Sequence, residues 1–369
     1  MFSTTPLTLL GLVSLATGAA VPSNDGFPMP SQDQQVMLAK QAGGKLPNVA
    51  LPKELGPGST TAFQLIAFNE LFETAYFDSL LRNITNGVQG YEAENKQELI
   101  HIFTTVRAQE ETHVLAAQAA LMAANASFVP SACQYMFPTT NLTQAVNIAE
   151  TFTAVVLGAL QGANVLFAKE NVTIPIQLIS SVIGQEGEQN GYYRTVLKEV
   201  PSESPFLTAV PAAFAFSALQ MFVVPGSCPF PLSNIDLPIF PPMMTNGQAV
   251  AALEAKDQKL SFSADLSKSD QAKKYIGGNG TDLFLTYTTG QQKPVSLDIS
   301  NVKWDNGMIS FDADFPFSEN VMDGFSHAAL TTGNVFESAD DVTHCALAGP
   351  TVIQVRGGTA AENVPSQCT

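Results

Sequence analysis

The chain has 369 residues, of which 45% are hydrophobic and only 14% are charged, and its formal net charge is −16. This length predicts two domains after processing, and the apolar content is ample for buried cores. Proteins that bind nucleic acids present a basic patch to the phosphates, which this acidic balance argues against. It also argues against docking on anionic membranes. We therefore expect no nucleic-acid partner.

The first twenty residues have the features of a secretory signal peptide. A short apolar run, 7–15, precedes small residues at 18–20, although no Lys or Arg precedes the run. The alternative is an ordinary apolar N-terminal segment. We expect residues 1–20 to be removed on export and residues 21–58, which are polar and rich in Pro and Gly, to form a flexible leader. The predicted location is extracellular, with the cell wall as one candidate site.

Five Asn-x-Ser/Thr sequons also indicate a secreted glycoprotein. All of them fall at predicted loops or helix ends, where a glycan has room: Asn83, Asn125, Asn141, Asn171 and Asn279.

The four cysteines allow three pairings. We favour Cys133–Cys228 and Cys345–Cys368, because each pair then lies within one predicted domain. A zinc site is the alternative, but the chain has no Cys-x-x-Cys spacing.

Four stretches have hydrophobic residues at helical spacing, and each carries a glutamate on its apolar stripe. The stretches are 60–82, 95–124, 142–168 and 175–199. The glutamates are Glu70, Glu110, Glu150 and Glu186. A carboxylate in an apolar core needs a partner, and helices that each direct one carboxylate to a shared axis build a two-metal site. We therefore predict a four-helix bundle with a metal site in its core.

The connections support a bundle. Residues 83–94 and 169–174 are short, which favours antiparallel neighbours, whereas 125–141 forms a longer crossover between the second and third helices. The apolar stretch 203–224 is interrupted by Pro211 and lacks basic flanks, so we expect a fifth helix on the bundle and no membrane span. The helical domain is expected to cover residues 59–225.

A Pro-rich linker is expected at 226–250, and from residue 251 the pattern changes to short strands separated by Gly, Asn and Asp turns. The predicted strands are LSFSADL, LFLTYTT, PVSLDIS, MISFDADF, HCALAGP and TVIQV. The fold class is therefore α+β with several domains, in which the helical domain precedes a small β-sandwich over 251–369.

The second helix carries a Glu-x-x-His, in which Glu110 and His113 project from one face. Carboxylate oxygens bind hard cations, and neutral imidazole suits iron, manganese or zinc. A symmetric two-metal site would also have a histidine at 189, where this chain has Gln189. An amide is a poorer ligand, and it could instead hold Glu186 or a water. Glu73, one turn beyond Glu70, is a candidate for an extra carboxylate. The alternatives are a buried partner for Arg194 and an exposed side chain.

The chain resembles the secreted ferritin-like family, which includes desiccation-related proteins and fungal stress-response or late sexual development proteins. The resemblance rests on FNELFETAYF, VRAQEETHVLAAQAAL, NIAETFTAVVLGALQGA and EGEQNGYYR, and it covers about residues 58–225. It implies a ferritin-like four-helix bundle. It also implies iron or manganese as the metal, held by Glu70, Glu110, His113, Glu150 and Glu186. The family usually has Glu-x-x-His in the last motif, from which Gln189 departs.

Two classes of function follow. The first is a non-enzymatic stress or developmental protein with a degenerate metal site, whose sandwich contacts the cell wall or an extracellular protein. The second is a di-iron or di-manganese enzyme, an oxidase or a catalase-like protein acting on oxygen or peroxide. Gln189 favours the first class, in which the bundle holds a vestigial site, a single metal ion or no metal. The sequence predicts neither the substrate nor the oligomeric state.

Overall fold

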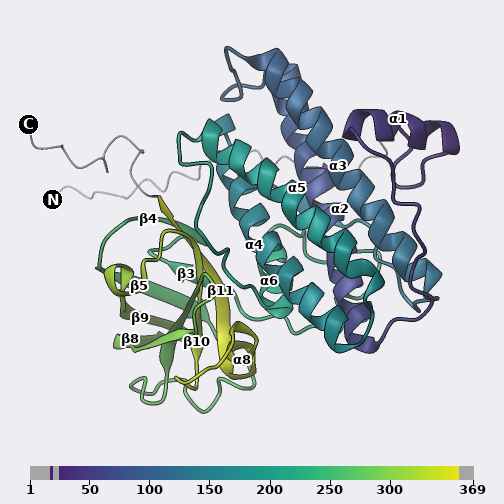
Figure 1. Cartoon of the computed structure of the whole chain (residues 1–369). Coiled ribbons are helices and arrows are strands. Elements are labelled where there is room, and N and C mark those ends of the chain that lie inside the picture. The colour runs from purple at the N-terminus through teal and green to yellow at the C-terminus, as the bar shows by residue number, and fades with distance from the viewer. Residues whose placement is uncertain (1–16, 20–24, 357–369) are drawn as a thin grey trace, which may run out of the picture.

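The computed structural model describes residues 17–19 and 25–356. The chain has the predicted α+β fold class, with a helical region followed by two β-sheets (Figure 1). Most of the predicted signal peptide lies outside the described residues. Residues Thr17–Ala19 form strand β1, which pairs antiparallel with β2, Gln134–Met136.

The four predicted helices are all present, with ends within a few residues of those expected. They are α2 (Pro57–Asn86), α3 (Lys96–Ala123), α4 (Leu142–Lys169) and α5 (Ile174–Val196). Helix α2 is buried on every side for most of its length, because it lies against α3, α4 and α6. Its aromatic residues Phe68, Phe72 and Phe77 fill the centre of the largest apolar core. On length and composition alone, α4 is the one described helix that could cross a membrane, but most of its apolar stretch is buried in the bundle.

The segment 21–58, predicted to be a flexible leader, contains a helix. Helix α1 (Gln32–Ala42) begins with a capping box at Ser31 and packs along the outside of α3 (Figure 1). The Arg107 guanidinium forms an ion pair of 3.0 Å with Asp25, just before this helix. Helix α1 also buries Leu38 and Ala42 against Ala108 of α3. This apolar contact holds the segment on the bundle although most of its residues are polar.

The predicted fifth helix is much shorter than expected. Helix α6 covers only Ala212–Leu219 and begins directly after Pro211. The residues before it bind the β region instead: the Thr208 hydroxyl donates to the Phe325 carbonyl, and the Ala209 N–H donates to the Gly290 carbonyl. Because the Ala209 N–H and the Thr208 hydroxyl bond to the β region, the apolar run does not continue as one helix from residue 203.

Two sheets form the β region, and their facing side chains share one core. The first sheet has the order β4-β11-β10-β6-β7, in which only β4 and β11 are parallel, and the second has the order β3-β5-β9-β8. The strands are β3 (Met243–Thr245), β4 (Val250–Glu254), β5 (Gln258–Asp265), β6 (Phe284–Thr289), β7 (Val295–Asp298), β8 (Ser300–Asp305), β9 (Met308–Phe315), β10 (Gly324–Thr331) and β11 (Ala346–Arg356). Two short helices, α7 (Phe317–Asn320) and α8 (Ala339–Cys345), and the 3₁₀ turn η1 (Leu232–Asn234) complete the elements.

Three features of this region differ from the sequence expectations. Strand β3 lies within the segment expected to be a linker, where Met243 is buried and pairs with Ala264 of β5. Strands β4, β8 and β10 were not predicted. The stretches HCALAGP and TVIQV belong mostly to one strand, β11, which continues through Pro350 at a register irregularity in its pairing with β10. A missing N–H is tolerated at such a position.

The helical region and the β region share a core. Phe325, Ala329 and Val352 of the first sheet belong to the same apolar cluster as Phe152 and Phe214 of the helices. Helix α6 packs on β11, and α4 contacts β10. The β region is therefore part of the environment of the bundle core.

The predicted disulfide Cys133–Cys228 is present and joins the crossover to the segment after α6. The described Cys345 has no disulfide partner within the described residues, and its predicted partner Cys368 lies outside them.

We expect the double variant Cys133→Ala/Cys228→Ala to lower the free energy of unfolding by about 4–5 kcal/mol, because the bond closes a loop of 95 residues. Urea denaturation with and without reductant measures this. An unchanged urea midpoint in the double variant would contradict it.

Candidate metal centre

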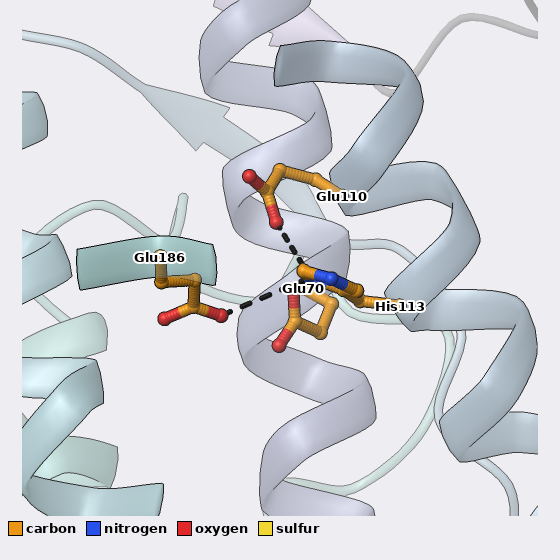
Figure 2. Close-up of side chains that lie close together, drawn as sticks. All are labelled: Glu70, Glu110, His113 and Glu186. Atoms are coloured by element: carbon orange, nitrogen blue, oxygen red, sulfur yellow. Dashed lines mark hydrogen bonds and ion pairs between the residues drawn. The ribbon is translucent and has the colours of Figure 1, made fainter. Parts of the chain in front are cut away.

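Three helices bring four of the five predicted ligands together. Glu70 comes from α2, Glu110 and His113 from α3, and Glu186 from α5, and one ligand atom of each lies within 4.8 Å of the others. Figure 2 shows the three carboxylates directed toward the imidazole from these helices. The three glutamates are fully buried, and His113 is buried except for 14% of its side chain. The helical periodicity of the sequence predicted this convergence.

One ring nitrogen of His113 faces all three carboxylates. Its Nδ1 lies 2.9 Å from Glu110 Oε2, 3.4 Å from Glu70 Oε2 and 3.8 Å from Glu186 Oε1. Burial lowers the pKa of His113, but the negative charges of Glu110 and Glu70 and the hydrogen bond with Glu110 outweigh burial and hold this pKa well above its usual value. In the protein without metal, a protonated His113 therefore supplies positive charge to the cluster.

A single imidazolium does not compensate this many carboxylates. Burial raises the pKa of Glu70 to about 7, although His113 opposes the shift. Burial, followed by repulsion from Glu70 and Glu110, raises the pKa of Glu186 well above its usual value. Within the described residues, neither oxygen of Glu70 or Glu186 accepts a well-aligned hydrogen bond. Buried carboxylate oxygens normally have partners, so these orphan atoms indicate a cation site.

Glu150, the fifth predicted ligand, does not join the cluster, and this part of the expectation is wrong. Its Oε1 accepts a hydrogen bond of 2.8 Å from Arg194 of α5, and its Oε2 accepts one of 3.0 Å from Gln354 of β11. The carboxylate is thus held at the boundary with the β region by two donors. The sequence signal for this arrangement is the position of Arg194, two turns after Glu186 on the same helix.

Glu73 occupies the neighbourhood of the cluster in place of Glu150. It lies one turn after Glu70 on α2, is fully buried, and accepts a hydrogen bond of 2.9 Å from Asn69. Burial, followed by repulsion from Glu110, Glu186 and Glu70, raises its pKa well above the usual value. The structure therefore favours the role of extra carboxylate for Glu73 over that of a partner for an arginine.

Gln189 holds the position where a second histidine would complete a two-metal site. Its Nε2 donates to Glu110 Oε1 at 2.7 Å and to Gln109 Oε1 at 3.1 Å. Its own Oε1 accepts a hydrogen bond from the Tyr193 hydroxyl at 3.3 Å. Tyr193 is completely buried and stacks with Phe103, so it packs in the core. Gln189 thus orients Glu110 through a side-chain hydrogen bond.

The donor set fits a hard or borderline divalent cation. Three carboxylates and one imidazole on facing helices are the ligand types that iron and manganese take in carboxylate-bridged bundles. The second metal position has Glu73 but has neither a histidine nor Glu150. The residues that come together therefore suit one ion better than two.

Residues 61–199 match the family model of the ferritin-like domain. The helical region is a ferritin-like domain. The match covers α2 to α5, and therefore every residue of the cluster, and such a fold often binds iron or manganese. No curated protein matches the chain.

Proposed function

We propose that this is a secreted stress or developmental protein whose ferritin-like domain binds one iron or manganese ion. The ligands would be Glu70, Glu110, His113 and Glu186. The observation that carries this proposal is the set of buried oxygens on Glu70 and Glu186 that accept no well-aligned hydrogen bond in the described structure. A cation would compensate them, whereas an unpaired buried carboxylate is costly.

Two residues at the site then have defined roles. His113 would give up its Nδ1 proton and bind through the nitrogen that faces the three carboxylates. Gln189 fixes the orientation of Glu110 by hydrogen bonding, as outer partners of metal ligands commonly do. Iron or manganese, when bound, supplies a redox-active Lewis acid.

Secretion is proposed on three features that agree. The N-terminal sequence has the pattern of a signal peptide, and the Cys133–Cys228 disulfide suits an oxidising compartment. None of the five sequon asparagines is buried, and all lie at helix ends or in loops. A contact with the cell wall or an extracellular protein would suit the acidic, glycosylated exterior and the additional β region.

The second candidate is an oxidase or catalase-like enzyme with two metal ions. Glu73 favours it, because this buried carboxylate borders the cluster and could serve a second ion. Two features disfavour this enzyme. Gln189 stands where a second histidine would be needed, and the Glu150 carboxylate is bonded to Arg194 and does not join the cluster. A two-metal centre needs about two histidines and four carboxylates around the pair, and here His113 is the one histidine at the site.

Elemental analysis of the secreted protein tests the choice. We expect at most one iron or manganese per chain and little turnover of peroxide. We expect Gln189→His to raise the stoichiometry above that of the unchanged protein, because its imidazole would face Glu110 and the Glu73 side of the cluster. Gln185→His is the matched control, since Gln185 bonds Gln109 without touching Glu110. Two ions per native chain with turnover of about 1–1000 per second would establish the enzyme instead.

A further inference from the structure

A cavity of about 330 Å³ lies beside the proposed metal site, between α2, α4, α6 and the segment that follows α6. Its volume is within the range of about 300–1,000 Å³ that is typical of small-molecule sites. Small residues on α4 leave this space open, namely Ala159, Gly162 and Ala163. The opposite wall comes from α2 and includes Leu65 and Ile66.

The wall on α2 continues to the metal cluster. Asn69 and Glu70 both line the cavity. The carboxylate of Glu70 belongs to the cluster, and Asn69 Nδ2 donates to Glu73 Oε1 at 2.9 Å. Glu70 therefore belongs both to the wall of the cavity and to the acidic cluster.

The charges of the cavity lie on exposed residues, apart from Glu70 in its wall. Lys169, Asp236 and Asp340 line it and are exposed, so both signs of charge are present. The remaining wall is mostly aliphatic. A charged group buried in such a space would lose its hydration without gaining a partner. The lining therefore selects the apolar body of a ligand and gives no site for a buried charge.

We propose that this cavity binds an uncharged, mainly apolar small molecule, which it places beside Glu70 and the proposed metal ion. The position relative to a metal rests on the proposed function, whereas binding in the cavity does not. If the metal site is active, the class of substrate is thus an apolar molecule and not a sugar, a nucleotide or a charged metabolite.

The test uses two fluorescent probes that differ by one charged group. N-phenyl-1-naphthylamine is neutral, and 1-anilinonaphthalene-8-sulfonate is its anionic relative. The folded full chain should bind the neutral probe saturably at one site, with an affinity at least about tenfold higher than for the sulfonate, because burial of the charge is unfavourable. Equal or tighter binding of the sulfonate would overturn the proposed ligand class.

A pair of glycine variants locates the binding site. Gly162 lines the cavity on α4, and the nearest atom to an added Cβ would be 3.8 Å away, so Gly162→Leu can fill the space without a backbone clash. Leucine also favours helix more than glycine does, so the variant should fold. We expect this variant to lower the affinity for the neutral probe by about tenfold or more, because the leucine side chain occupies the space that the probe needs. Gly184→Leu on α5, in open space and outside the cavity, is the matched control.

Metal loading separates the two proposals. Mn²⁺ bound at Glu70 and His113 should broaden the proton NMR signals of the neutral probe by paramagnetic relaxation. Mn²⁺ binding without probe binding, or probe binding that Gly162→Leu does not affect, would overturn the cavity assignment and leave the metal proposal intact. Probe binding without any Mn²⁺ binding would overturn the metal proposal alone. Binding of both without broadening would overturn the placement beside the ion.

Discussion

Replacing Arg194 with methionine is expected to lower the free energy of unfolding by about 3–5 kcal/mol, which is the usual cost of removing one partner of a buried ion pair. Arg194 is 5% exposed and contacts Glu150 at 2.8 Å and Glu199 at 3.2 Å. Its Nε also donates to the Val200 carbonyl. Denaturant unfolding followed by circular dichroism measures the change. Lys293→Met, which removes an exposed ion pair with Glu337, is the control and should cost about 0–1 kcal/mol.

The cost of Arg194→Met should depend on pH. Burial and repulsion from Glu203 and Glu199 raise the pKa of Glu150 to about 8, and Arg194 opposes this shift. A carboxyl group whose pKa is raised by folding stabilises the protein fully at pH values below its pKa in the unfolded chain, near 4.5. This stabilisation is lost as the pH rises through the pKa in the folded protein, about 8. Without Arg194 the pKa of Glu150 should rise further, so the loss extends to higher pH and becomes larger. We therefore expect a larger cost of Arg194→Met at pH 8 than at pH 5.

Glu150→Gln in the Arg194→Met background should recover part of the stability, because the amide removes the uncompensated charge and still accepts from Gln354. An equal cost at both pH values, together with no recovery in the double variant, would show that Arg194 acts by packing alone.

The second large effect is expected for Glu186→Gln, which should change metal affinity and stability in opposite directions. Loss of a direct ligand should weaken Mn²⁺ binding by more than the roughly 10–100-fold typical for loss of an outer partner. In the metal-free protein, the same variant removes a buried carboxylate without hydrogen-bond donors in the described structure. We therefore expect metal-free Glu186→Gln to be more stable by about 0.5–2 kcal/mol, as is common when a functional site is neutralised.

Calorimetric titration with Mn²⁺ and denaturation in the presence of a chelator test the two effects. Glu188→Gln, an exposed position on the same helix, should change neither. A Glu186→Gln protein that binds Mn²⁺ as tightly as the native protein would exclude Glu186 as a ligand. A loss of stability in the metal-free variant would indicate that the Glu186 carboxylate is held by a structural contact and not poised for a cation.

The sequence by itself determined the bundle and most of its metal cluster. Hydrophobic residues at helical spacing fix which face of each helix is buried, and Glu70, Glu110, His113 and Glu186 lie on those faces. The pairing of Cys133 with Cys228 was also predicted from the sequence, because both cysteines lie within one predicted domain. The ends of α2 to α5 were predicted well for the same reason, since long periodic segments with Gly, Asn or Pro at their ends leave little choice.

Strand β10 shows why parts of the β region could not be predicted. All eight of its residues are buried, and they include Ser326, His327 and Thr331 as well as apolar residues. The alternation that marks a half-exposed strand is therefore absent, and polar residues interrupt the apolar run that marks a buried one. Only pairing with β6 and β11 on both sides fixes this segment as a strand.

The choice between Glu73 and Glu150 was decided by the tertiary structure alone. Both are glutamates on apolar helical stripes, and periodicity shows that a side chain is buried without showing what it meets there. The packing of α4 against the β region brings Gln354 to Glu150, and the packing of α5 brings Arg194 to it. These two donors hold the Glu150 carboxylate outside the cluster. Glu73 has only Asn69 as a hydrogen-bond donor in the described structure, and the negative charges of the other glutamates repel its carboxylate. The partners available to a buried charge come from elements distant in sequence, and they decide which carboxylates remain for a metal ion.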